Sequence, residues 1–136
     1  MAHVIAVAGK RRRGEKTTLC GMLIQYLCEK GKGPILAVDA DANSNLNEVL
    51  GVKVETTLGD VREEIARAEL AKENPIPTGM SKADYAEMRF EDALVEDDDF
   101  DLLSWAELRE KAVTVMLMVF FRLSLQNTRI IIRILL

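Results

Sequence analysis

Apolar and polar positions alternate in blocks along the first forty residues, and each apolar block predicts one element. His3 to Ala8 is a short apolar run rich in β-branched residues, which is typical of a strand buried on both faces of a parallel sheet. The apolar positions that follow recur at helical spacing and predict a helix; they are Leu19, Met22, Leu23, Tyr26 and Leu27. Gly31, Gly33 and Pro34 then predict the end of that helix. A second apolar run, Ile35 to Val38, predicts another buried strand.

The middle of the chain predicts two amphipathic helices joined by a loop. Thr57 to Ala71 repeats apolar residues on one side at helical spacing, with charged residues between them. The Asn-Pro and Pro-Thr-Gly content of residues 74–79 indicates a loop. Ser81, followed three residues later by Asp84, is typical of an N-cap, and we expect its helix to extend through Leu94.

The last forty residues change character. The acidic run Glu96 to Asp99 predicts a solvated turn before a strand at Phe100 to Leu103, and it lacks the spacing and the glycine of a calcium loop. Two apolar runs follow, Val113 to Phe121 and Ile130 to Leu136. Both are shorter than the roughly 18 to 20 residues that span a bilayer. A buried strand, a buried helix and a membrane-surface helix all fit these runs, and the sequence favours none of them.

Composition places the chain among globular proteins without a basic surface. Its 136 residues support one domain, and 49% of them are hydrophobic. The net charge of −4 argues against a protein that coats nucleic acid, because phosphate neutralisation needs a basic surface. Cys20 and Cys28 are about 12 Å apart along one predicted helix, too far for a disulfide, so we expect buried thiols in a reducing cytoplasm. His3 is isolated, no signal peptide is expected after Met1, and we predict no membrane partner.

The segment between the first strand and the first helix has the pattern of a phosphate-binding loop. Such a loop needs small residues so that backbone N–H groups can curl around phosphate oxygens, while a lysine and a threonine complete the phosphate and Mg²⁺ contacts. The matching residues are Gly9, Lys10, Gly14, Lys16, Thr17 and Thr18. Arg11 to Arg13 and Glu15 depart from the pattern, since they stand where small residues are needed.

Two carboxylates follow the second strand, in the segment Asp39-Ala40-Asp41-Ala42-Asn43. Ligands of open α/β sheets bind at the carboxyl ends of the strands. The sequence therefore predicts that Asp39 and Asp41 share a site with the loop.

Together these two motifs resemble the deviant Walker A ATPases of the MinD/ParA type. Within that class, the chain resembles one branch more specifically, the CooC family of nickel-insertion accessory ATPases of carbon monoxide dehydrogenase. The similarity is carried by Thr57 to Ile65, Gly79 to Lys82, Glu91 to Glu96 and Phe100 to Leu103. It implies an α/β, three-layer P-loop NTPase fold with a parallel sheet. Residues 1–103 would form the N-terminal half of that ATPase domain, and residues 104–136 an apolar tail foreign to the family.

The resemblance also implies how a nucleotide would be held. Gly9 and Gly14 would shape the loop around ATP, and Lys16 would contact the β- and γ-phosphates. Thr17 would ligate Mg²⁺, and Thr18 would contact the α-phosphate.

Three residues are implied as catalytic. Lys10 matches the signature lysine that reaches the phosphates across a homodimer with the nucleotide sandwiched between the subunits. Asp41 would orient the attacking water, and Asp39 would support the Mg²⁺ shell beside Thr17. The implied partner is carbon monoxide dehydrogenase, and the implied cargo is nickel. The Cys-x-Cys metal motif of the family is absent from this chain.

The departures from the family gather at two places, and we hypothesise that both are shifts of reading frame. Arg11 to Glu15, read one nucleotide late, can encode Gly-Gly-Val-Gly-Lys, with one extra residue restoring the frame. The stretch from Ser104 onward, read one nucleotide early, can encode a family-like segment with a Cys-x-Cys motif. The coding DNA tests this hypothesis. As written, arginine side chains and the Glu15 carboxylate in the loop predict weak ATP binding or none.

Three functions therefore stay open at the sequence level. The leading one is an ATP-hydrolysing metallochaperone for nickel insertion, impaired as written. The others are a partitioning or septum-placement ATPase of the same class, and an inactive fragment without catalysis.

Overall fold

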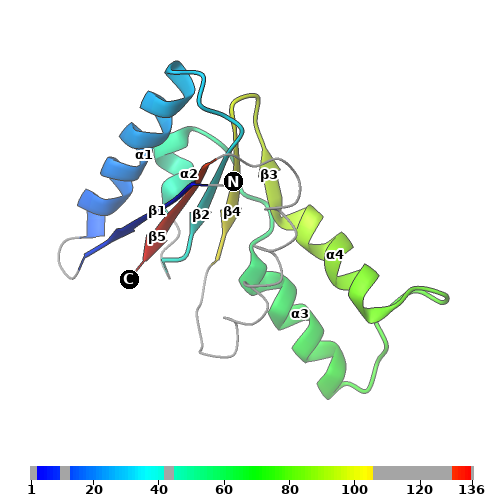
Figure 1. Cartoon of the computed structure of the whole chain (residues 1–136). Helices are drawn as coiled ribbons and strands as arrows, with labels where there is room; N and C mark the ends of the chain where they lie inside the picture. Colours follow the sequence, from blue (N-terminus) through cyan, green and yellow to red (C-terminus); the bar gives the residue numbers. More distant parts are fainter. Residues whose placement is uncertain (1–2, 10–12, 42–44, 106–129, 136) are drawn as a thin grey trace.

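A computed structural model describes residues 3–9, 13–41, 45–105 and 130–135, and in these residues strands and helices form an α/β fold (Figure 1). The strands are β1 (His3–Ala8), β2 (Ile35–Asp39), β3 (Leu94–Glu96), β4 (Phe100–Ser104) and β5 (Ile130–Leu135). The helices are α1 (Arg13–Glu29), α2 (Leu46–Leu50), α3 (Leu58–Leu70) and α4 (Lys82–Ala93).

The five strands form one sheet in the order β1-β5-β2-β4-β3. β1, β5, β2 and β4 are parallel, and β3 pairs with β4 in the antiparallel sense. In the β2–β4 register, Asp39 lies beside Ser104. The predicted parallel sheet is confirmed, whereas β3 was missed: Leu94 was assigned to the end of a predicted helix and Glu96 to the acidic turn.

Helices cover both faces of the sheet, which gives the expected three layers (Figure 1). Alternate side chains of β2 point to opposite faces, so Ile35 and Ala37 lie on the α1 and α2 side, and Leu36 and Val38 lie on the α3 and α4 side. The buried residues on the first side are Cys20, Ile24, Ile35, Ala37, Leu46, Leu102 and Ile132. Those on the second side are Leu36, Val38, Leu58, Val61, Ala93, Leu103 and Trp105.

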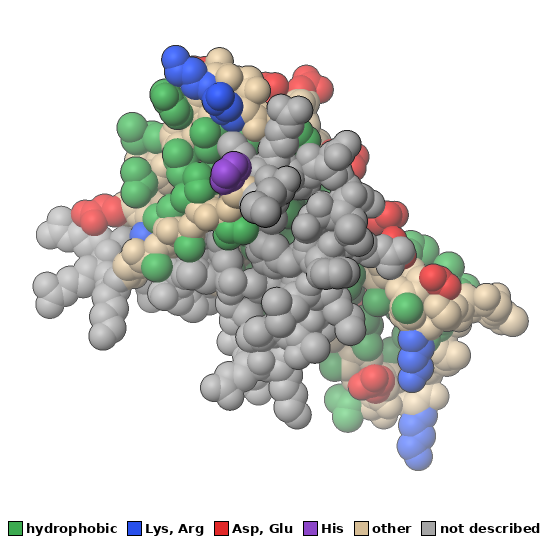
Figure 2. Space-filling model, in the orientation of Figure 1, with side chains coloured by type: hydrophobic (Ala, Val, Ile, Leu, Met, Phe, Trp, Pro, Cys, Tyr) green, Lys and Arg blue, Asp and Glu red, His purple; other side chains and the backbone are tan. Residues whose placement is uncertain are grey.

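Helix α1 corrects one interpretation of the sequence. Leu19, Met22 and Tyr26 were expected to form the apolar face of this helix, but they point away from the sheet and are 55%, 64% and 55% exposed. Cys20 and Ile24 face the core instead. Figure 2 shows the resulting apolar side chains gathered over α1 and β1. The helix is apolar on both sides, and spacing alone does not tell which side is covered.

Strand β1 has the predicted bounds but not the predicted burial. His3–Ala8 forms the outer strand of the described sheet, with β5 as its neighbour, and Val4 is 61% exposed. The predicted burial of this strand on both faces is therefore wrong. Central and outer strands of a parallel sheet can have the same apolar, β-branched composition, so composition does not tell which position a strand takes.

The other predicted elements follow from local capping chemistry. Thr57 caps α3, accepting a hydrogen bond from the backbone N–H of Asp60, whose carboxylate in turn accepts from the N–H of Thr57. Ser81 caps α4 by accepting from the N–H of Asp84. The helix ends at Ala93, one residue before the predicted end.

Gly31 ends the α1 region as predicted, and its φ of 60° is a left-handed conformation that favours glycine.

The structure describes one of the two apolar runs of the tail. Val113 to Phe121 lies outside the described residues, and Ile130–Leu135 pairs between β1 and β2.

Both cysteines are free, and Cys20 is buried as predicted, but Cys28 is only partly buried. Within the described residues, no helix has the length and apolar character needed to cross a bilayer.

Candidate functional site

The first turns of α1 carry the lysine and threonine of the predicted loop. The helix begins at Arg13, six residues before the first apolar position used to predict it, so Gly14, Lys16, Thr17 and Thr18 belong to its backbone. Thr17 is 7% exposed and lies on the side of α1 that faces the sheet, whereas Thr18 is exposed.

Gly9 lies directly after β1 and close to the stem of Lys16. A Cβ atom on Gly9 would lie 3.7 Å from Cδ of Lys16. The stem of the lysine side chain therefore lies close to the end of the strand. Lys10, Arg11 and Arg12 lie outside the described residues.

Asp39 is the last residue of β2 and is held by backbone groups. Its Oδ1 accepts a hydrogen bond from the N–H of Asp41 at 3.2 Å, and its Oδ2 accepts from the N–H of Leu46, the first residue of α2, at 3.0 Å. The carbonyl oxygen of Asp39 accepts from the N–H of Trp105 at 2.8 Å. The side chain is 1% exposed. These bonds fix the carboxylate in position.

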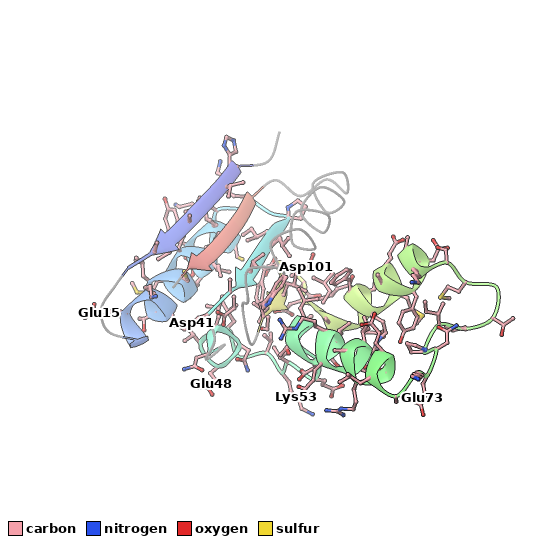
Figure 3. All side chains as sticks on the ribbon, turned by 90° about the horizontal axis from the view of Figure 1, so that it is seen from below. Glu15, Asp41, Glu48, Lys53, Glu73 and Asp101 are labelled. Atoms are coloured by element: carbon pink, nitrogen blue, oxygen red, sulfur yellow. The ribbon has the colours of Figure 1, made fainter. Side chains whose placement is uncertain are left out.

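The predicted residues from α1 and from β2 lie at the same edge of the sheet. The thiol of Cys20, on the inner side of α1, is close enough to Asp39 and to Lys16 for both charges to affect its pKa, in opposite directions. Figure 3 shows Glu15 at the start of α1 and Asp41 after β2. Both lie toward the end of the molecule to which the arrows of β1 and β2 point. Asp41 is itself 6% exposed. The structure thus brings Lys16, Thr17, Asp39 and Asp41 to one edge.

Burial raises the pKa of the Asp39 carboxyl, and the negative charge of Asp41 raises it further. The two backbone hydrogen bonds from Leu46 and Asp41 act in the opposite direction, because they favour the charged form. Removal from water is the largest of these effects, so the pKa of the Asp39 carboxyl lies above its usual range.

The oxygen atoms at this edge fit the chemistry of Mg²⁺. Mg²⁺ is a hard cation that proteins hold through one or two carboxylates, with substrate phosphates and water supplying the other ligands. Asp39 supplies a buried carboxylate with a raised pKa, and Thr17 supplies a buried hydroxyl. Among the described residues there is no cluster of three or more His, Cys, Asp or Glu side chains that would hold a metal ion without a nucleotide.

Sequence reasoning missed the backbone groups of this site. The N–H groups of Leu46 and Trp105 hold Asp39, and a side-chain motif carries no signal for a backbone donor. Ser104, in register with Asp39, was assigned to the tail. Ala42 and Asn43 of the second motif lie outside the described residues.

Comparison with known proteins gives a sequence relative and a structural neighbour. No family model matches the chain. The chain is 47% identical over 100 residues to an uncharacterized ATP-binding protein of Methanocaldococcus jannaschii. The match covers 74% of this chain and 38% of that protein, so the chain spans less than half the length of its relative.

The structural neighbour is a plasmid partition protein from Borrelia burgdorferi, with a TM-score of 0.55 and 13% sequence identity. The match covers 98% of this chain and 56% of the neighbour. At this identity the similarity establishes the fold, which is that of a ParA-like P-loop NTPase fragment. The relative is named as an ATP-binding protein, and this chain shares the fold of the partition protein.

Proposed function

We propose that this chain carries the nucleotide-binding part of an ATP-hydrolysing maturation factor that delivers nickel to carbon monoxide dehydrogenase. The observation that carries the ATPase half of this proposal is that Lys16 and Thr17 of α1 lie at the same edge of the sheet as the buried Asp39 of β2. The name of the Methanocaldococcus relative supports ATP as the ligand. The nickel half rests on the CooC-like segments of the sequence.

The residues at this edge have the properties that phosphoryl transfer needs. Transfer of a phosphoryl group to water depends on positioning and on charge stabilisation rather than on covalent chemistry. Lys16 would neutralise phosphate charge, and Thr17 and Asp39 would hold Mg²⁺ with the nucleotide. Bound Mg²⁺ would neutralise the phosphate oxygens. Asp41, two residues after Asp39, would orient the attacking water.

The proposal includes the assembly that the family resemblance implies. Two chains would sandwich the nucleotide, with Lys10 of each reaching the phosphates bound by the other. Carbon monoxide dehydrogenase would receive nickel as cargo, and ATP hydrolysis would drive its release. We propose a cytoplasmic location, in keeping with two free cysteines.

The loop as written weakens nucleotide binding in this proposal. Glu15 lies in the first turn of α1, where the N-terminal end of a helix attracts anions, and its carboxylate repels phosphate there. Arg11 and Arg12 add side chains where a backbone cradle needs none. We expect the chain to bind Mg·ATP weakly or not at all.

Titration of Mg·ATP into two full-length chains tests the proposal. The first is the chain as written, and the second has residues 11–16 replaced by Gly-Gly-Val-Gly-Lys. We expect micromolar affinity in the repaired chain and at least about tenfold weaker binding in the original, a difference of about 1.4 kcal/mol. Micromolar affinity in the original chain would contradict the effect assigned to the loop. No binding by a folded, repaired chain would favour an inactive fragment.

A partitioning ATPase is the second candidate, because the structural neighbour is a plasmid partition protein. The acidic net charge of −4 does not favour DNA as a partner. The two candidates differ in what stimulates ATP hydrolysis by the repaired chain. Stimulation by nickel-free carbon monoxide dehydrogenase with Ni²⁺ supports the first candidate, and stimulation by double-stranded DNA supports the second.

A further inference from the structure

Ser104 has an unusual position for a serine hydroxyl. It is the last residue of β4, it is 1% exposed, and its Oγ has no hydrogen-bond partner among the described residues. Buried hydroxyl groups are almost always hydrogen-bonded, because leaving one unpaired costs the solvation it had in water. An unpaired buried hydroxyl at the ligand-binding edge of a sheet therefore points to an acceptor that arrives with a ligand.

The hydroxyl lies on the same side of the sheet as the candidate site. Asp39 and Ser104 are register partners on the parallel strands β2 and β4, so their side chains point to the same face. Alternation along each strand agrees, since Ala37 and Leu102, two residues earlier, both belong to the α1 and α2 side. Thr17 faces this layer from α1.

Asp39 does not satisfy Ser104. Both carboxylate oxygens of Asp39 already accept backbone hydrogen bonds, from Asp41 and from Leu46, and neither is paired with the serine. The other buried unpaired side-chain atom among the described residues, Nε of Arg89, belongs to a guanidinium group that is otherwise paired with Glu64 and Asp92 between α3 and α4. Ser104 is therefore the unpaired buried group at the carboxyl edge of the described sheet.

We propose that Ser104 is a further binding residue of the nucleotide site, whose hydroxyl donates a hydrogen bond to an oxygen atom brought in by magnesium triphosphate. The acceptor is a phosphate oxygen or a water of the Mg²⁺ shell, which share this chemistry. The inference rests on the proposed function. It extends the predicted site from the loop and β2 to a third strand, β4, beyond the boundary at Leu103 that the sequence predicts.

Replacing Ser104 by alanine separates this role from a structural one. Ser104→Ala removes the hydroxyl with little change of volume. Without ligand, we expect the melting temperature to stay unchanged or to rise, since no hydrogen bond is lost and an unpaired polar group is removed. With ligand, we expect about tenfold weaker binding of Mg·ATP in the repaired full-length chain. Ser104→Thr keeps the donor and should bind within about threefold of the parent.

Ser81→Ala is the matched control, because Ser81 caps α4 and lies outside the site. It should lower the melting temperature and leave the affinity for Mg·ATP unchanged, the reverse of Ser104→Ala. Titration with ATP in a chelator distinguishes the two acceptors. Loss of affinity that persists without Mg²⁺ indicates a phosphate oxygen, and loss that appears only with Mg²⁺ indicates a metal-bound water.

Two results would overturn the inference alone: an Mg·ATP affinity that Ser104→Ala leaves unchanged, or a melting temperature that falls without ligand. A fall would mean that the hydroxyl already has a partner in the protein. If the repaired chain with Ser104 in place binds no nucleotide, the proposed function fails, and this inference fails with it.

Discussion

Gly21 of α1 and Val49 of α2 pack so closely that a methyl group on Gly21 would overlap Cγ1 of Val49. The contact fixes α2 against α1. Since the first residue of α2, Leu46, donates its N–H to Asp39, the packing of these two helices also positions the buried carboxylate.

Gly21→Ala tests this contact. Alanine favours a helix over glycine by about 1 kcal/mol, but overpacking of a close contact costs roughly 1 to 3 kcal/mol. We expect a net loss of stability of up to about 2 kcal/mol, measured by urea unfolding. In a Val49→Ala background the overlap disappears, so the same change should stabilise the chain by about 1 kcal/mol. An equal effect in both backgrounds would show that the two residues do not touch.

Ile132→Ala tests whether the end of the chain belongs to the fold. Ile132 is fully buried on β5, in the middle of the sheet. Truncating a buried isoleucine to alanine costs about 2 to 5 kcal/mol, and Ile132→Val should cost about 1 kcal/mol. Urea unfolding of both variants gives the measurement. If residues 104–136 are a tail without a place in the fold, as the frameshift hypothesis predicts, neither substitution will change stability.

The raised pKa of Asp39 predicts a pH-dependent effect of Asp39→Asn. The folded state binds the Asp39 proton more tightly than the unfolded state, so this contribution to stability is present below the unfolded pKa of about 3.9 and is lost as pH rises through the folded pKa. The free energy of unfolding of Asp39→Asn, relative to the parent, should therefore increase from pH 4 to pH 7. The acceptor lost in asparagine adds an offset that does not depend on pH. A difference that stays constant with pH would contradict the raised pKa.

Cysteine labelling reports the same environment. Burial, with a smaller contribution from the Asp39 charge, raises the pKa of the Cys20 thiol to about 11, and Cys28 is more accessible. At pH 8 only about one Cys20 in a thousand is thiolate, the reactive form. A thiol reagent should modify Cys28 first and Cys20 at the rate of unfolding. A Cys28→Ser chain should then show the slow phase alone, and rapid labelling of that chain would place Cys20 at the surface.

Local chemistry accounts for what could be predicted from the sequence. The cap at Ser81 depends on two side chains three residues apart, and α4 begins where Ser81 predicts. Helix α3 begins one residue after Thr57, the first residue of the predicted amphipathic pattern. The apolar run of β2 and the two aspartates after it likewise place Asp39 and Asp41 at the ligand-binding edge.

Tertiary context accounts for what could not be predicted. Leu19 and Met22 have the spacing of a core face, but β5 and β2 contact the opposite side of α1. The position of β5 between β1 and β2 depends on pairings between residues 127 and 95 positions apart, His3 with Ile130 and Ile35 with Ile130, which no local pattern encodes. The donors that hold Asp39 are backbone groups, whose positions follow from the fold and not from residue type.

The burial of Trp105, whose backbone N–H donates to the carbonyl of Asp39, gives this molecule an intrinsic optical reporter. Trp105 is the one tryptophan of the chain, and it is 4% exposed between the sheet and the α3 and α4 layer. Its emission wavelength therefore follows the wetting of a single ring in the α3 and α4 layer, on the face of the sheet opposite to the Asp39 carboxylate. Fluorescence can thus monitor each variant above without an attached dye.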